Sequence, residues 1–190
     1  MGNRGVLHDA SKQIVTEWRT KRWIACALEF RGRRREVLAP GRYSELFFLD
    51  EATALAAGHR PCAECRRLRY EEFRRAWARG RGHRAAEPLP GADDIDRVLH
   101  DQRAPSDGSA KGFRARLASL PPGVMVELGG RPWLLLGSQL LAWSFDGYDQ
   151  PIAAPRETRV RVLTPRSIVR AIRSGFAPGI HESAKPFARG

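Results

Sequence analysis

Cys62 and Cys65 are the residues of this sequence whose spacing most directly indicates chemistry. They are separated by two residues in HRPCAECRR, with Pro61 before the pair and a helical pattern directly after it. A C-x-x-C turn aims two thiolates at one ion, as in zinc knuckles, and thioredoxin-like redox pairs share this spacing. A redox pair sits between a strand and a helix of an α/β unit, whereas here a proline precedes the pair. We therefore predict a metal-binding knuckle.

Cysteine is otherwise scarce in the chain. There are three cysteines among 190 residues, and Cys26 is the third of them. An odd and low number argues against a disulfide framework and favours metal ligation or redox chemistry. Cys26 lies in RWIACALEF, a predicted strand over residues 22–30, where a small buried hydrophobic side chain is the competing interpretation.

The segment FFLDEATALAAGHRPCAECRR, residues 47–67, resembles the second half of the zinc domain of the Ada alkylation-repair family. In outline the resemblance covers residues 4–75. It implies a structural zinc ion with four protein ligands and contact with the DNA backbone, and it implies nothing about residues 85–190. The residues that match the family pattern are Phe48, Ala54, Gly58, Arg60, Pro61, Cys62 and Cys65, with His59 at a position that is aromatic in the family.

The resemblance also raises the question of the remaining zinc ligands. The Ada pattern takes two more cysteines from one upstream loop, whereas this chain offers only Cys26 there. A fourth ligand then comes from elsewhere, most simply from a histidine. His8 is the first candidate, because VLHD and WIACA as neighbouring strands would present His8 and Cys26 together. His59 is the second, although three ligands from one short turn strain a tetrahedron. For each histidine, an ordinary core or surface imidazole is the alternative.

Two enzymatic alternatives remain beside a structural zinc site. In the Ada family one zinc-bound cysteine accepts a methyl group from a DNA phosphotriester, and chain order makes Cys26 its counterpart. The C-x-x-x-C loop that presents that nucleophile is absent from this sequence. The second alternative is a metal-dependent hydrolase at Asp96 and His100, which are four residues apart on a predicted helix. Acidic residues in a first helical turn are also favoured by the helix dipole, so capping competes with this interpretation.

Positive charge exceeds negative charge and is concentrated in the N-terminal half. The net charge is +12 and the isoelectric point is near 10.8. Residues 1–84 hold 19 Lys and Arg against 10 Asp and Glu, whereas residues 85–190 hold 14 against 11. Most of the cations are arginine, which pairs bidentately with phosphate and stacks on bases. This balance favours a nucleic-acid partner, DNA first, with a role in DNA repair or processing. The alternative is a protein-interaction module whose charge reflects genome composition.

Two arginine clusters are candidates for the nucleic-acid contact. One is RGRRR at a predicted hairpin tip, and the other begins the helix after the knuckle. Such side chains would bind phosphates with salt-dependent affinity and without sequence readout. A solvated loop and helix face is the competing interpretation. The candidate residues are Arg31, Arg33, Arg34, Arg35, Arg66, Arg67 and Arg69.

The elements that position these residues predict an α+β fold. Residues 1–84 are expected to form an Ada-like zinc module of short strands and two helices. Short strands are predicted at residues 22–30 and within 36–48, where Pro40-Gly41 marks a turn that breaks the segment. The first helix follows Asp50 as its cap and stops at Gly58. The second runs from about Cys65 to Gly80 and carries one apolar stripe, formed by Tyr70, Phe73 and Trp77.

The rest of the chain is expected to hold a small antiparallel β domain. Residues 85–112 are predicted as a linker with a short helix at 93–103. Residues 113–178 form the β-rich domain, with a hairpin that turns at Gly129-Gly130, further strands at 139–145 and 160–164, and a closing C-terminal helix. That helix is predicted to start with Thr164 as its cap and Pro165 as its first residue. Residues 179–190 are predicted as a tail.

The sequence also indicates a setting for the protein. No apolar run approaches the roughly 18 to 20 residues of a membrane span. The first residues, MGNRGVLHDASK, lack the apolar core of a secretion signal. We therefore expect a soluble, cytoplasmic protein without a membrane partner. The choice between DNA and RNA, the oligomeric state and the role of the C-terminal half stay open.

Overall fold

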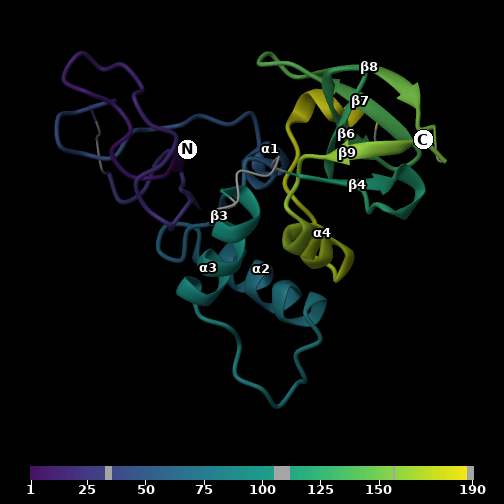
Figure 1. The fold of residues 1–190 in the computed structure, drawn as a ribbon, viewed down its shortest axis with the longest axis horizontal. Coiled ribbons are helices and arrows are strands. Elements are labelled where there is room, and N and C mark those ends of the chain that lie inside the picture. The colour runs from purple at the N-terminus through teal and green to yellow at the C-terminus, as the bar shows by residue number, and fades with distance from the viewer. Residues whose placement is uncertain (33–35, 105–111, 156, 188–190) are drawn as a thin grey trace.

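The computed structural model describes residues 1–32, 36–104, 112–155 and 157–187. Within them the chain has a mixed α+β fold with one three-stranded and one six-stranded sheet. Figure 1 shows the N-terminal loops and the six-stranded sheet on opposite sides of the molecule, with helices between and below them. The mixed α+β class predicted from the sequence is confirmed.

The three-stranded sheet is small and is built from distant parts of the N-terminal half. Its strands are β1 (Gly2–Asn3), β2 (Ile24–Ala25) and β3 (Arg60–Pro61). β1 runs antiparallel to β2, and β2 runs parallel to β3. Strand content in this half is therefore much lower than the sequence pattern indicates.

The strands predicted at residues 22–30 and on both sides of the Pro40-Gly41 turn within 36–48 are mostly absent. Only two residues of the first form a ladder, and the second contributes a single bridge between Leu46 and Gly2. The ladder stops after Ala25 because the next part of the chain turns toward the cysteines, where the Ala27 N–H donates to a sulfur. β-branched and aromatic composition favours a strand only where a neighbouring strand is available to pair with it.

Helix α1 (Glu51–Ala56) forms as predicted, with Asp50 as its N-cap. The Asp50 carboxylate accepts from the Thr53 N–H at 2.8 Å, and the Thr53 hydroxyl accepts from the Asp50 N–H at 3.0 Å. This reciprocal pair satisfies two amides at the start of the helix. Gly58, with φ of 79°, then turns the chain into β3.

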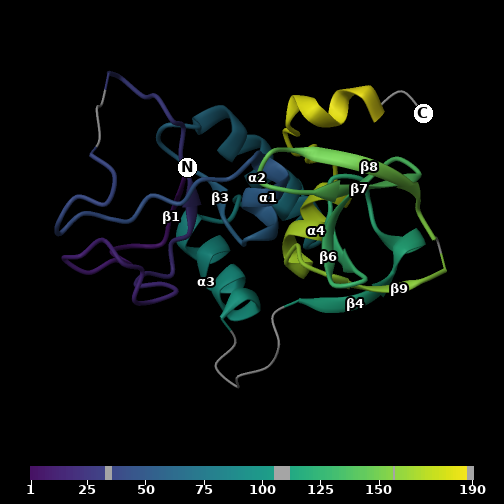
Figure 2. The ribbon, with the colours of Figure 1, turned by 90° about the horizontal axis from the view of Figure 1, so that it is seen from above.

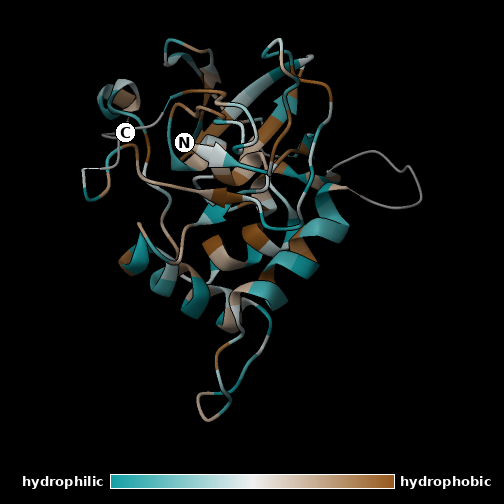
Figure 3. Cartoon of the chain, turned by 90° about the vertical axis from the view of Figure 1, so that its left-hand side faces the viewer, coloured by the Kyte–Doolittle hydropathy of each residue, from teal (hydrophilic) through white to brown (hydrophobic). Residues whose placement is uncertain are grey.

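Helices α2 (Arg67–Gly80) and α3 (Ala92–Arg103) also lie where the sequence indicates. The predicted apolar stripe of α2, formed by Tyr70, Phe73 and Trp77, is buried. Helix α3 buries Ile95 and Leu99 on its inner side. Figure 3 shows helices that carry hydrophilic and hydrophobic positions side by side, as expected of helices with one face in the core.

The six-stranded sheet is antiparallel throughout, in the order β4-β9-β5-β6-β7-β8. The predicted hairpin is present, and Gly129 and Gly130 at its turn have φ of 60° and 72°, which a two-residue turn of this hand requires. The strands are β4 (Phe113–Arg116), β5 (Met125–Leu128), β6 (Arg131–Leu136), β7 (Gln139–Trp143), β8 (Tyr148–Ala153) and β9 (Arg159–Val162).

The two edge strands, β4 and β8, are absent from the sequence prediction. β8 contains Pro151 and an exposed Gln150 with φ of 46°, and these features favour a turn over a strand. Proline is accepted at an edge, where its missing N–H breaks no ladder. Edge position is a property of the whole sheet, so local composition does not indicate it.

Helix α4 (Arg166–Arg173) closes the C-terminal half, and its inner face buries Ile168, Val169 and Ile172. The predicted cap is wrong, because the Thr164 hydroxyl accepts instead from the Met125 N–H at 2.9 Å. Pro165 occupies the cap position itself. Thr164 thus joins the start of the helix to β5.

The last described residues pack against the molecule where a tail was predicted. Residues Glu182–Phe187 form a 3₁₀ helix, η2, and Ala184 is buried. The Ser183 hydroxyl accepts from the Tyr148 N–H at 2.9 Å, which holds this segment to β8. Figure 2 shows the C-terminal helical segment, in yellow, lying over β8.

The main core cluster draws on both halves of the chain. Phe73 and Trp77 of α2 belong to the same cluster as Val126 of β5 and Ile168 of α4. Phe73 also meets Phe176 edge-to-face, with ring centroids 5.2 Å apart. The helices of the N-terminal half and the six-stranded sheet therefore share one hydrophobic interior.

Candidate metal centre

The structure brings all three cysteines together. The Sγ atoms of Cys26, Cys62 and Cys65 all lie within 4.8 Å of one another. Bound to one zinc at about 2.3 Å each, sulfur atoms of a tetrahedral site lie about 3.8 Å apart. The three thiols are thus close to the spacing that a single ion would impose.

The parallel pairing of β2 with β3 explains this convergence. Ala25 stands opposite Pro61 in the ladder, and Cys26 and Cys62 are the residues that directly follow the two strands. The Cys62 N–H donates to the Ala25 carbonyl at 3.0 Å, which fixes their relative position. The turn after Cys62 then returns Cys65 to the same point before α2 begins.

Hydrogen bonds within the group favour a thiolate at Cys62. The Cys26 thiol donates to Cys62, and with help from backbone amides it lowers the pKa of Cys62 to about 5. The Glu64 N–H points at the Cys62 sulfur at 3.4 Å, and the Ala27 N–H points at the Cys65 sulfur at 3.2 Å. The same hydrogen bond raises the pKa of Cys26, because the Cys26 thiol is the donor and must keep its proton to form it. Amides aimed at sulfur stabilise thiolates, which is the form that a metal needs.

Neither histidine proposed as the fourth ligand belongs to this group. The His8 Nδ1 lies 2.6 Å from the Ser44 hydroxyl, so its ring is engaged elsewhere in the N-terminal loops. His59 is fully buried between Phe48 and Trp23, and its Nε2 accepts from the Arg4 guanidinium at 3.2 Å. Burial, together with Arg4 and Arg103, holds the pKa of His59 well below its usual range. Among the described Asp, Glu, His and Cys residues, the group comprises the three cysteines alone.

The arginines predicted at the start of α2 are partly occupied within the molecule. Arg66 and Arg69 both bind the buried carboxylate of Glu51, Arg66 at 2.7 Å. Arg69 also donates to the Ala177 carbonyl at 2.8 Å. These two side chains therefore hold α2 to α1 and to the C-terminal segment. Arg67 is exposed and pairs with Glu71 one turn along the helix.

The other predicted arginine cluster lies largely beyond the described residues. Arg33, Arg34 and Arg35 fall outside them. Arg31 is exposed, and its guanidinium lies 5.0 Å from the ring centroid of Phe30. Of this cluster only Arg31 is placed, and it faces solvent.

Asp96 and His100, the residues of the hydrolase alternative, have different partners in the structure. Both Asp96 oxygens accept from the buried Arg60 guanidinium, at 3.0 and 2.7 Å. His100 instead meets Trp18 edge-to-face, with ring centroids 4.5 Å apart. A carboxylate bound at both oxygens has little capacity left for a metal or a water nucleophile. The structure therefore removes the geometric basis of the hydrolase alternative.

A cationic cluster around Trp23 escaped the sequence analysis. Trp23 is buried between two guanidinium groups, Arg4 at 3.9 Å and Arg103 at 4.3 Å from the ring centroid. Arg103 donates to the Gly58 carbonyl at 2.8 Å, which places α3 beside the approach to the cysteines. No local pattern indicates this cluster, because its members are far apart in the sequence.

No protein-family model, curated protein or solved structure matches this chain. Its functional assignment therefore rests on its own residues. Over the part of the chain that the structure places, no helix has the length and apolar character needed to cross a membrane.

Proposed function

We propose that this chain is a zinc-binding protein that contacts nucleic acid, DNA in the first instance, with a role in DNA repair or processing. The observation that carries the proposal is the convergence of Cys26 with Cys62 and Cys65, which come from two separate places in the chain. Three sulfur donors are a ligand set that zinc prefers over magnesium or calcium. The resemblance of residues 47–67 to the Ada zinc domain supports the same ion.

The centre has a structural role in this proposal. It joins the ends of β2 and β3 to the start of α2, and each of these strands has only two residues. So short a ladder contributes little stability by itself. A bound metal adds its binding free energy to that of folding. Zinc would thereby fix the position of α2 relative to the N-terminal loops.

The number of donors favours one alternative function at the same site. The placed residues supply three ligands, and a zinc site with three protein ligands keeps a position for water or substrate. Cys26 is partly exposed in the structure. In this alternative the Cys26 thiol gives its proton to solvent, its sulfur forms a bond to the methyl carbon, and the bond from that carbon to the phosphate oxygen breaks to release a phosphodiester. The structural role remains the leading proposal, because the loop that presents the nucleophile in the Ada family is missing.

The nucleic-acid part of the proposal draws on charge that stays at the surface. Arg75 and Arg79 are exposed on α2, and Arg170 and Arg173 are exposed on α4. The two helices touch where Gly80 approaches the backbone of Arg170, and Arg79 donates to the Ser174 carbonyl at 2.7 Å. We name these four arginines the α2/α4 basic surface. A backbone carbonyl is neutral and does not cancel the charge of the guanidinium that donates to it, so this charge remains available for phosphates.

Elemental analysis of zinc per chain tests the metal site. We expect about one zinc in the wild-type protein and its loss in Cys62→Ser and Cys26→Ser, since each removes one of three sulfur donors. His8→Ala is the matched control, and we expect it to retain zinc because His8 binds Ser44. A wild-type protein that contains no zinc would contradict the proposal. Loss of zinc in His8→Ala would restore His8 as the fourth ligand.

A further inference from the structure

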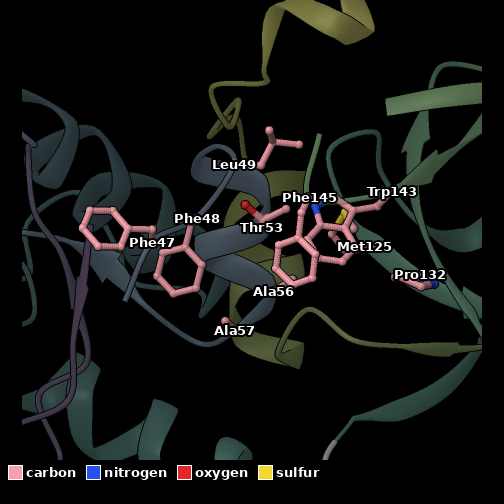
Figure 4. A pocket seen from close by; sticks show the side chains of 10 residues that line it. All are labelled: Phe47, Phe48, Leu49, Thr53, Ala56, Ala57, Met125, Pro132, Trp143 and Phe145. Carbon is pink, nitrogen blue, oxygen red and sulfur yellow. The ribbon is translucent and has the colours of Figure 1, made fainter. Parts of the chain in front are cut away.

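An aromatic pocket of about 300 Å³ lies between the segment that leads into α1 and the end of β7. Figure 4 shows Phe47 and Phe48 on one side of it and Trp143 with Phe145 on the other. Ala56, the last residue of α1, and Ala57, its C-cap, also line the pocket. The remaining lining residues are Leu49, Thr53, Met125 and Pro132.

Two of the aromatic side chains are strongly exposed. The exposed fraction is 62% for Phe47 and 88% for Phe145. Phe145 meets Trp143 edge-to-face with ring centroids 4.9 Å apart, and the rest of its ring faces solvent. Exposed aromatic rings gathered beside a pocket are typical of a binding surface. The volume is at the lower end of the range for small-molecule sites.

The pocket provides stacking surfaces and few hydrogen-bonding groups. The Thr53 hydroxyl is already bonded to Asp50. The indole N–H of Trp143 is buried and lacks a hydrogen-bond partner among the residues that the structure places. A pocket of this kind suits a flat aromatic ring. A nucleobase of any identity qualifies, because every base has a π-face.

The charge beside the pocket favours an anionic ligand. The Arg4 guanidinium donates to the carbonyl of Ala57, one of the lining residues, at 3.4 Å, and to the His59 imidazole. Neither of these partners carries a negative charge. The charge of the Glu17 carboxylate raises the pKa of Arg4, whereas burial lowers it, and the chain as a whole carries a net charge of +12. A hydrophobic peptide would use the rings but would gain nothing from this charge.

We propose that this pocket binds an unstacked nucleobase between Phe48 and Phe145, with the attached phosphate directed toward Arg4. The inference rests on the proposed nucleic-acid function and specifies it, because an accessible base implies single-stranded or locally opened nucleic acid. A free mononucleotide has the same chemistry, and the experiment separates the two sources.

Fluorescence anisotropy with two labelled oligonucleotides tests this inference. One is a short single-stranded DNA, and the other has the same length and phosphates but abasic sugars. For Phe145→Ala we expect about tenfold weaker binding of the normal strand, the order of magnitude of one lost base stack, and unchanged binding of the abasic strand. Because Phe145 is so exposed, its removal leaves the fold intact. Leu68→Ala is the matched control, since Leu68 is a large apolar residue on α2 that is 81% exposed.

The outcomes separate failure of the pocket from failure of the proposed function. Equal weakening of both strands by Phe145→Ala, or no weakening of either, would overturn the base-binding inference while nucleic-acid binding stands. A wild-type protein that binds neither strand but binds a mononucleotide through Phe145 would retain the pocket and overturn the nucleic-acid proposal. If the wild-type protein binds neither strand and no mononucleotide, both the base-binding inference and the nucleic-acid proposal would be overturned. A dimer that dissociates on Phe145→Ala, with nucleotide affinity unchanged, would identify the surface as a contact between copies.

Discussion

At the residue scale, the ion pair between Arg60 and Asp96 links the segment before the cysteines to helix α3. Both side chains are almost completely buried, at 4% and 2% exposure. The guanidinium binds both carboxylate oxygens, and it also donates to the Pro61 carbonyl at 3.1 Å. Breaking a buried pair by removing one partner leaves an uncompensated charge, and this is more costly than losing a surface pair.

Asp96→Asn should therefore destabilise the protein by about 3 kcal/mol, measured by denaturant unfolding. Asp93→Asn on the same helix is the control, because Asp93 pairs with Arg22 at the surface with both side chains about 70% exposed. We expect a change of less than about 1 kcal/mol for that variant. Similar losses in the two variants would show that burial of the Arg60 pair does not matter for stability.

The cysteine cluster depends on the β2–β3 ladder more than on the local sequence around each cysteine. Cys26 and Cys62 meet because they follow paired residues of a two-residue parallel ladder. A shift of one residue in that register would move Cys26 to the other face of the strand. The C-x-x-C turn positions Cys65 locally, whereas the position of Cys26 depends on the ladder.

At the element scale, α2 and α4 cross with their basic sides exposed. Arg75 and Arg170 lack a carboxylate or other hydrogen-bond partner among the placed residues, so they are the freest members of the α2/α4 basic surface. Arg66 and Arg69 are instead bound to Glu51. We infer that the C-terminal half of α2, and not its start, contacts the nucleic-acid phosphates.

The double variant Arg75→Ala/Arg170→Ala should weaken DNA binding and lower the slope of log K against log salt by about 2, about one for each lost phosphate contact. Titrations at several salt concentrations measure this slope. Arg114→Ala/Arg159→Ala removes the same charge from exposed positions on β4 and β9 and should leave the slope nearly unchanged. An equal effect of the two double variants would indicate that net charge, rather than this surface, determines affinity.

At the scale of the whole molecule, one hydrophobic interior joins the two halves predicted from the sequence. Phe73 lies at its centre, fully buried, with Trp77 and Phe176 as ring neighbours. Glu51 adds a polar link, since it binds Arg66 and also accepts from the Gly179 N–H at 2.9 Å. Shared packing of this kind favours cooperative unfolding of the whole chain.

Phe73→Ala should destabilise the whole chain by about 3 to 5 kcal/mol and preserve a single unfolding transition. Far-UV circular dichroism and tryptophan fluorescence report on secondary structure and on core packing, and their midpoints should coincide. Phe47→Ala, at an exposed position, is the control and should shift neither midpoint by much. Two separate transitions in the wild-type protein would instead support independent domains at the predicted boundaries.

The sequence alone determined the features that depend on local physics. The caps and apolar stripes predicted α1, α2 and α3, and the Gly129-Gly130 pair predicted the β5–β6 hairpin, because capping, helical periodicity and left-handed turn geometry act over a few residues. The proximity of Cys62 and Cys65 is also a local feature, because two residues separate them in one turn. The two edge strands of the six-stranded sheet, β4 and β8, were not predicted, because edge strands have a weaker hydrophobic pattern.

Only the tertiary structure decided which distant residues meet. It placed Cys26 beside the C-x-x-C turn, directed His8 to Ser44 and engaged Arg66 and Arg69 with Glu51. It also assembled the aromatic pocket from α1 and the sheet. These contacts join residues whose sequence separation exceeds any local pattern, and they depend on how the helices and sheets bury a common core. Composition indicates the chemistry available, and packing determines which groups act together.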